Sequence, residues 1–384
     1  MPWRKVTPMS ERINMCKLAQ EGKYNIAELS RDFGVSRKTI YKWLDRYVEG
    51  GETALFDRSR RPRRCPEGLD PALTDAILSL NIQYPMWGPR KLHRILTHQL
   101  GGEATLSISS VARVLKRHGL SQSRDVTPRQ EAVGRFERGE PNDLWQTDFT
   151  SPIKLPDGSK LMPAPILDDH SRYCVSLIAA KDCSTASALT GLRIAASRYG
   201  LPRQVLSDHG SAFGVSRAQI SGFTAYLWAL EVDHIQGRYA HPQTQGKLER
   251  FNRTLRKECI SRHNYTTIED WNKCFEEYRQ IYNEVRPHEA LADEVPAVRY
   301  KPSERTFVEP DRDYREPGDN LTHRRVDVSG KIWLLQHHVK VGNGLAGWIV
   351  AAKHNGNGIW TIQFRDRLIC QSQLAKPAAY KPRP

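Results

Sequence analysis

Three acidic residues stand where a carboxylate could act on a phosphate: Asp148 in a run of strand character, Asp208 after a short apolar run, and Glu249 on the polar face of a helical pattern. Carboxylate oxygens suit Mg²⁺ or Mn²⁺, and two such ions about 3.5–4 Å apart hold the attacking and leaving oxygens of a phosphodiester transfer. Singly, each acid has a simpler structural explanation; Glu249 could pair with Arg253, four residues on. The chemistry therefore requires a fold that gathers all three.

The segment around these acids predicts an α/β sheet. Runs of apolar or alternating character bounded by turn residues predict strands, and apolar residues at helical spacing predict helices. The expected strands are 144–151, 161–167, 173–179 and 204–207, and the expected helices are 185–199, 245–260 and 271–283. Three antiparallel strands followed by a helix and a parallel strand form one sheet, at whose strand ends carboxylates are well placed for a site.

Five motifs in this segment carry a resemblance to a known family. They are Trp145–Thr150, Asp168–Tyr173, Ser207–Phe213, His241–Asn252, and Tyr282–Asn283 with Arg286–His288. Their types and order resemble the insertion-sequence DDE transposases, whose catalytic core is similar to that of retroviral integrases. The resemblance covers about residues 140–300, and the order of the flanking domains is also that of the family.

The resemblance implies an RNase H-like core in which Asp148, Asp208 and Glu249 are the catalytic, metal-binding triad. It implies two Mg²⁺ ions, for which Mn²⁺ can substitute, with Asp148 shared between them. Two departures are visible: 40 residues separate Asp208 from Glu249, which suggests a small insertion at 214–222, and His209 stands where the family commonly has Asn. By the same analogy, Asp168 and Asp169 are expected to be structural.

The N-terminal third predicts two helix-turn-helix units joined by an arginine-rich segment. In the first unit, Gly34 suits the sharp turn, Ser36 can cap the third helix, and the outward face of that helix suits a DNA major groove. The arginine-rich segment suits a narrow minor groove, although a solvated linker is the alternative. The expected DNA contacts in this third are Arg37, Lys38, Thr39, Tyr41, Lys42, Arg58, Arg60, Arg61, Arg63, Arg64, Arg90 and Lys91.

The charge distribution also favours a polyanionic partner. The formal net charge is +15, made up of +9 in residues 1–140, 0 in 141–300 and +6 in 301–384. Lysine and arginine displace counterions from phosphates, so basic ends around a neutral middle suit DNA. Near the third acid, the expected DNA contacts are Arg238, Gln243, Lys247, Arg250, Arg253 and Arg256, with solvated surface charge as the alternative.

The whole chain is therefore predicted to be multidomain: all-α helix-turn-helix units, an α/β core and a small C-terminal β-barrel, SH3-like by resemblance. The expected parts are a helix-turn-helix domain at 1–57, a linker at 58–69, a second helical DNA-binding domain at 70–122, a linker at 123–140, the catalytic core at 141–300, a linker at 301–322 and the barrel at 323–376. Six short runs between glycine turns indicate the barrel.

The sequence excludes some classes of protein and leaves two alternative functions open. No run of about 18 apolar residues occurs, and the seven scattered cysteines include no C-x-x-C pair, so a membrane span, secretion and structural zinc are not expected. The expected function is that of a transposase that binds terminal inverted repeats, cuts the element's ends and joins them to target DNA. It would act as a dimer or larger assembly in a bacterial cytoplasm, associated with the nucleoid. One alternative is a non-catalytic DNA-binding regulator derived from a transposase, and a second is a nuclease of the same core fold without joining activity.

Overall fold

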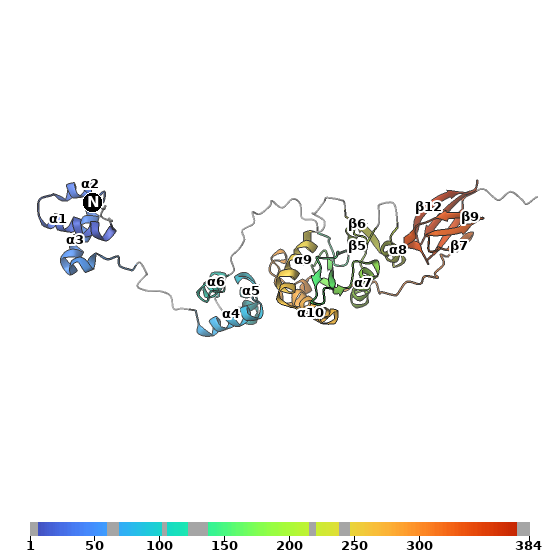
Figure 1. Ribbon diagram of the computed structural model, residues 1–384, viewed down its shortest axis with the longest axis horizontal. Coiled ribbons are helices and arrows are strands. Elements are labelled where there is room, and N and C mark those ends of the chain that lie inside the picture. The colour runs from blue at the N-terminus through green and yellow to red at the C-terminus, as the bar shows by residue number, and fades with distance from the viewer. Residues whose placement is uncertain are drawn as a thin grey trace, which may run out of the picture. The chain divides into compact units, whose positions relative to one another are not determined.

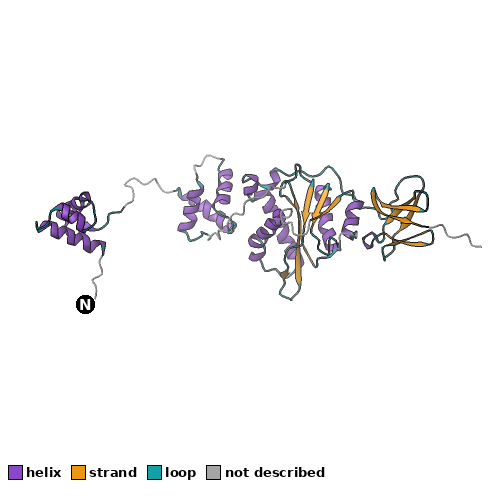
Figure 2. Cartoon of the chain, turned by 90° about the horizontal axis from the view of Figure 1, so that it is seen from above, coloured by secondary structure: helices purple, strands orange, loops and turns teal. Residues whose placement is uncertain are grey.

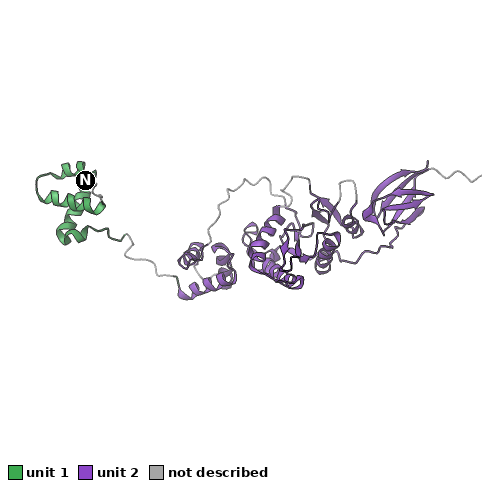
Figure 3. Cartoon of the chain, viewed as in Figure 1, with its two compact units in different colours: residues 1–69 green, residues 70–384 purple. Residues whose placement is uncertain are grey.

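The computed structural model describes residues 7–59, 69–101, 106–121, 137–214, 220–237 and 246–374. The chain divides into two compact units, residues 1–69 and 70–384 (Figure 3). Among the described residues, no helix has the length and apolar character needed to cross a membrane.

The first unit is a three-helix bundle. It consists of α1 (Pro8–Gln20), α2 (Ile26–Asp32), α3 (Arg37–Gly50) and a short 3₁₀ helix, η1 (Gly51–Leu55). Each α-helix is capped at its start by a side chain that accepts a hydrogen bond from a backbone N–H of the first turn; these side chains are those of Thr7, Asn25 and Ser36 respectively. Gly34 has φ +62°, as the turn between α2 and α3 requires. Leu29, Ile40 and Trp43 lie in the shared core.

A second helical bundle opens the other unit. It consists of α4 (Pro71–Gln83), α5 (Pro89–Gln99) and α6 (Ile108–Arg117). Proline stands at the start of α4 and α5, where the lost N–H costs no helical bond, and the Ser107 side chain caps α6. Apolar side chains on one face of each helix are buried: Ile77, Leu80, Leu92, Leu96, Val111, Val114 and Leu115.

The centre of this unit is a six-stranded mixed sheet. Its strands are β1 (Leu144–Thr147), β2 (Ile153–Lys154), β3 (Lys160–Asp168), β4 (Cys174–Ala180), β5 (Gln204–Ser207) and β6 (Asp233–Gln236). The order is β2-β3-β1-β5-β6, with β4 also paired to β3. The pairs β1·β3 and β3·β4 are antiparallel, whereas β1·β5 and β5·β6 are parallel. One expectation was wrong: the first strand ends at Thr147, so Asp148 follows the strand rather than lying inside it.

Helices cover both faces of the sheet (Figures 1 and 2). They are α7 (Thr185–Tyr199), α8 (Gly222–Ala229), α9 (Gly246–Glu258) and α10 (Ile268–Gln280), followed by a π-helical turn, η4 (Ile281–Val285). Three 3₁₀ turns, η3 (Ile260–Arg262), η5 (Glu289–Leu291) and η6 (Pro296–Val298), complete the region. Apolar residues of α7 and α8 pack in one core with Trp145 and Val205, and those of α9 and α10 pack in another with Leu167 and Leu177.

The C-terminal strands form two sheets. The strands are β7 (Leu321–Arg325), β8 (Lys331–Leu334), β9 (His337–Lys340), β10 (Ile349–His354), β11 (Ile359–Phe364) and β12 (Arg367–Gln373), with one 3₁₀ turn, η7 (Asn343–Leu345). The antiparallel order β12-β11-β10-β7 stands beside a β8-β9 hairpin. Within residues 321–374 no pairing joins the two sheets, so the expected closed barrel is not confirmed. β7 ends at Arg325, and the next residue, Val326, is buried and donates its N–H to the Trp348 carbonyl.

Candidate active site

Asp148 and Asp208 lie at matching ends of two neighbouring strands. β1 pairs with β5 in parallel, with Gln146 opposite Leu206, and each aspartate is the second residue beyond that pair. Neighbouring strands lie about 4.8 Å apart, so the parallel pairing brings together two residues that are 60 positions apart in the chain. The Asp148 carboxylate accepts a hydrogen bond from the Phe149 N–H at 2.7 Å, and that of Asp208 accepts one from the Gly210 N–H at 2.8 Å.

The Asp148 carboxyl lies within the electrostatic influence of the other two acids. Burial raises the pKa of the Asp148 carboxyl to about 6, and the charge of Asp208 acts in the same direction. The Phe149 N–H opposes this rise, and the charge of Glu249 adds a smaller contribution to it. Like charges in a partly buried site resist ionisation until a cation or donor neutralises them.

Helix α9 carries Glu249 in its first turn, with the side chain exposed. Leu248, Phe251 and Leu255 bury the opposite face of the helix against the sheet. The polar face of α9 is also bonded to the rest of the core. An Arg256 N–H donates at 3.1 Å to the carbonyl of Ser151, which lies in the segment that follows β1. The core contacts and this bond set where α9 passes the ends of the central strands.

The donor set fits a hard divalent cation. Carboxylates are the ligand type that Mg²⁺ and Mn²⁺ prefer, and the charges of Asp208 and Glu249 both raise the pKa of the Asp148 carboxyl. Within the described residues, however, no three His, Cys, Asp or Glu side chains already stand close enough to hold one ion. The exposed Glu249 side chain would have to turn toward the two aspartates to complete a ligand set.

Asp168 and Asp169 are structural, as expected. Both are fully buried. The Asp168 carboxylate accepts hydrogen bonds from the Asn142 N–H at 2.7 Å and from the Ser171 N–H and hydroxyl at 2.8 and 2.6 Å. The Asp169 carboxylate accepts bonds from the Arg138 N–H, the Gln146 amide and Lys247. Their carboxylate oxygens are occupied by hydrogen bonds and an ion pair within the protein.

The cations on α9 divide into free and engaged groups. Lys247 lies 2.7 Å from the Asp169 carboxylate with 13% of its side chain exposed, so its charge is neutralised inside the core. Arg250 and Arg253 are exposed, and within residues 246–374 no ion pair joins Arg253 to Glu249. Arg256 is exposed but bonded to Ser151. Arg238 and Gln243 lie outside the described residues.

The predicted DNA-contact residues of the first unit lie mostly on one open helix face. On α3, Arg37, Lys38, Tyr41 and Lys42 are exposed, and Thr39 is half-buried. Arg58 is exposed as well. The remaining arginines of this set, Arg60, Arg61, Arg63 and Arg64, lie outside the described residues. The contact of these side chains with DNA stays a prediction.

Arg90, which is exposed, and Lys91, which is half-buried, both have acidic partners. The Arg90 guanidinium lies 2.7 Å from the Asp293 carboxylate through one nitrogen and 3.3 Å from that of Glu289 through another. Lys91 lies 3.5 Å from Glu258. Sequence reasoning missed these acids, since no local pattern joins α5 to residues about 170–200 positions later.

The motif at 282–288 had no assigned role and proves to be a structural tie. The Asn283 amide accepts from the Cys174 N–H at 2.8 Å and donates to the Cys174 carbonyl at 2.9 Å, which fixes η4 to the first residue of β4. The Arg286 guanidinium makes two 2.8 Å bonds to Glu258, the last residue of α9. The motif therefore holds the helices of one face against the sheet.

Known domain families match most of the chain. Residues 138–242 and 230–296 match two families described as integrase core domain. Residues 11–63 match a helix-turn-helix domain, and residues 39–115 match a homeodomain-like domain. The prediction of helix-turn-helix units followed by an integrase core of RNase H-like type is confirmed.

Two curated relatives agree with these matches. The chain is 26% identical over 238 residues to the uncharacterized 39.2 kDa protein of insertion element IS476 from Xanthomonas euvesicatoria, covering 61% of this chain and 66% of the relative. It is 22% identical over 269 residues to the transposase for transposon Tn552 from Staphylococcus aureus, covering 64% of this chain and 55% of the relative. The alignments thus span just under two thirds and about half of the relatives' own lengths.

Among solved structures, the catalytic core domain of HTLV-2 integrase in complex with magnesium aligns with 42% of this chain and 97% of its own, at 19% identity and a TM-score of 0.33. The domain matches and the insertion-element relatives confirm the predicted resemblance to insertion-sequence transposases with an integrase-like core.

Proposed function

We propose that this chain, which carries helix-turn-helix domains and an integrase core and resembles insertion-sequence transposases, is itself a DNA transposase. It would bind the terminal inverted repeats of a mobile element, hydrolyse phosphodiester bonds at the ends, and join the freed 3′-hydroxyls to target DNA. The observation that carries this proposal is the pair Asp148 and Asp208 at the ends of parallel neighbours β1 and β5, with Glu249 in the same electrostatic field.

Asp148, Asp208 and Glu249 would hold divalent ions, proposed as two Mg²⁺. When bound, such ions neutralise charge on the phosphate and activate the attacking and leaving oxygens. The residues around the site would orient the carboxylate ligands. The Phe149 and Gly210 N–H groups fix the two aspartate side chains, and buried residues such as Trp145 and Phe213 exclude water from beneath the site.

The proposed partners are double-stranded DNA and further copies of this chain. The exposed cations at the start of α3 suit a major groove, and Arg250 and Arg253 stand within one turn of Glu249, where a scissile phosphate would approach. Paired ends need two active sites, which is why a dimer or larger assembly is proposed.

A strand-transfer assay on element-end DNA with Mg²⁺ tests the proposal. Wild type should yield joined products, and Asp208→Asn should yield none, because the amide removes one ligand charge without changing shape. Asp319→Asn is the matched control, since Asp319 is exposed in the segment before β7. Equal products from wild type and Asp208→Asn would refute the catalytic assignment. If the wild-type protein binds the DNA without cutting it, the protein is a DNA-binding regulator. If it nicks the DNA without joining the ends, it is a simple nuclease.

A further inference from the structure

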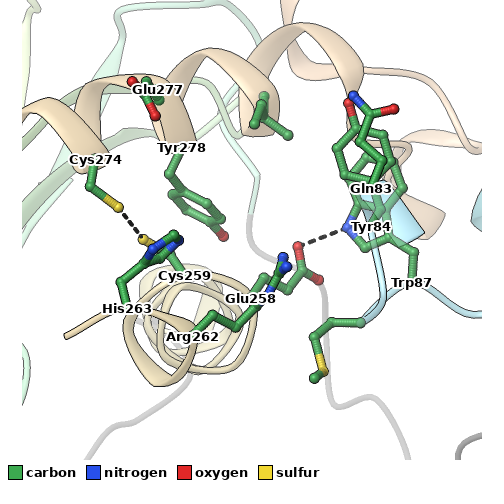
Figure 4. A pocket seen from close by; sticks show the side chains of 12 residues that line it. Gln83, Tyr84, Trp87, Glu258, Cys259, Arg262, His263, Cys274, Glu277 and Tyr278 are labelled. Atoms are coloured by element: carbon green, nitrogen blue, oxygen red, sulfur yellow. Dashed lines mark hydrogen bonds between the residues drawn. The ribbon is translucent and has the colours of Figure 1, made fainter. Parts of the chain in front are cut away.

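A buried carboxylate ends the helix that carries Glu249. Glu258 is the last residue of α9, with 9% of its side chain exposed. Arg286 donates to both of its oxygens at 2.8 Å, and the Trp87 indole N–H donates to one of them at 3.0 Å (Figure 4). The Lys91 Nζ lies 3.5 Å from the Glu258 Oε1. Four donor atoms from two distant segments therefore converge on one side chain.

Two cations, Arg286 and Lys91, face the single Glu258 carboxylate. Burial disfavours ionised Glu258, but the hydrogen bonds and charge of Arg286, with the charge of Lys91, outweigh it and hold the pKa of Glu258 below its ordinary value. A bidentate arginine–carboxylate pair also fixes direction, because both partners are planar. Glu258 is thus a charged, oriented anchor.

The cluster joins three parts of the unit. Trp87 and Lys91 belong to the second helical bundle, Glu258 to α9, and Arg286 to the segment after η4. Trp87 is itself fixed by stacking on Tyr84, with ring centroids 3.9 Å apart. Arg90 and Arg94 add a second attachment, to the Asp293 carboxylate and carbonyl. A cavity of about 160 Å³ lined by Tyr84, Trp87, Glu258 and Tyr278 lies beside the cluster (Figure 4).

The position of Glu249, near the other end of α9, determines whether its carboxylate can reach the two aspartates. Glu249 lies nine residues before Glu258, roughly 14 Å along a rigid helix at 1.5 Å per residue. Its carboxylate belongs to the field of the two aspartates, yet the three acids do not stand as a closed ligand set. We therefore expect the position of α9 to affect whether Glu249 can join the two aspartates in one ligand set.

We propose that Glu258 is a positioning residue through which the second helical bundle, by way of Trp87 and Lys91, sets α9 and hence Glu249 relative to Asp148 and Asp208. A bundle gripping DNA would then influence the assembly of the site through this carboxylate. The inference rests on the proposed function, because it assumes that Glu249 is a metal ligand.

Two variants and one probe test it on the full chain. Glu258→Gln removes the anchoring charge, whereas Trp87→Phe keeps an aromatic ring beside Tyr84 and removes the indole donor together with part of the buried ring. The probe is Mn²⁺ alone, titrated calorimetrically without DNA. Loss of a group that orients a metal ligand typically weakens metal binding about 10–100-fold. We expect the Mn²⁺ dissociation constant to rise about tenfold or more in Glu258→Gln and severalfold in Trp87→Phe, with faster amide hydrogen exchange in 246–258.

Glu284→Gln is the matched control, because Glu284 is an exposed glutamate just before Arg286, and it should stay within about twofold of wild type. If Glu258→Gln does not fold, the Mn²⁺ affinity and hydrogen exchange of Trp87→Phe test the inference. Wild-type Mn²⁺ affinity and wild-type exchange in the folded variants would overturn the inference. Asp208→Asn separates the two proposals: if it too binds Mn²⁺ like wild type, the proposed metal site fails, and if only Asp208→Asn loses binding, only the positioning role fails.

Discussion

Asp148 sits beside Asp208 because β1 and β5 run parallel and end together, and the charge of Asp208 adds to burial in raising the pKa of the Asp148 carboxyl to about 6. A carboxyl whose pKa is raised in the fold is destabilising when ionised. The pair is therefore held together by the sheet against its own repulsion, as expected of groups placed for a cation.

The first prediction concerns stability at this site. Asp148→Asn should raise the free energy of unfolding at neutral pH by about 1–2 kcal/mol, because it removes a partly buried charge next to Asp208. Urea unfolding without divalent metal measures this. Strand transfer by the same variant should vanish. An Asp148→Asn protein less stable than wild type would contradict the electrostatic argument.

Asp168 should behave in the opposite way. Its carboxylate is fully buried and accepts three hydrogen bonds, so Asp168→Ala leaves the Asn142 and Ser171 donors unpaired. We expect a loss of about 3 kcal/mol in the free energy of unfolding, by the same urea measurement. A loss below about 1 kcal/mol would show that these bonds are dispensable.

A third prediction concerns acid sensitivity. Burial lowers the pKa of His234 to about 4 and that of His288 to about 3, with nearby positive charge from His209 and Arg286 respectively. Below about pH 6.5 the unfolded chain binds protons that the folded histidines refuse, so stability should fall as pH drops from 6.5 toward 4, by up to about 1.4 kcal/mol per pH unit for each histidine.

The measurement is unfolding free energy against pH for wild type and His234→Gln. The variant should show a shallower fall across this window, because one of the two histidines no longer takes up a proton on unfolding. His337→Gln is the control, since His337 is exposed. Parallel profiles for wild type and His234→Gln would exclude His234 as a source of the acid sensitivity.

The fourth prediction concerns DNA binding by α3. Lys38 and Lys42 are exposed on this helix, so replacing either with Ala should weaken duplex binding and lower the slope of log affinity against log salt by about 0.9. Fluorescence anisotropy over a salt series measures both. Lys17→Ala, on α1 and paired with Glu52, should leave the slope unchanged. An unchanged slope for Lys38→Ala and Lys42→Ala would remove α3 from the DNA interface.

The sequence by itself determined the candidate acids and several of the elements, although not β2, β6 or α8. The helix expected at 185–199 and the strand expected at 204–207 match α7 and β5, because apolar spacing is a local property that survives in the fold. The motif order was enough to indicate the integrase-like core, and Ser36 was correctly expected to cap the third helix of the first unit.

Only the tertiary structure decided which of these residues meet. Parallel pairing of β1 with β5 joins Asp148 to Asp208, and packing of α5 on the core commits Arg90 and Lys91 to carboxylates far along the chain. The sequence does not show that Asp148 pairs with another acid or that Arg90 and Lys91 pair with acids, because the partners lie far along the chain. Periodicity reports which face of an element is buried, whereas the partner of a charge depends on how separate elements pack, and that is fixed by the whole core at once.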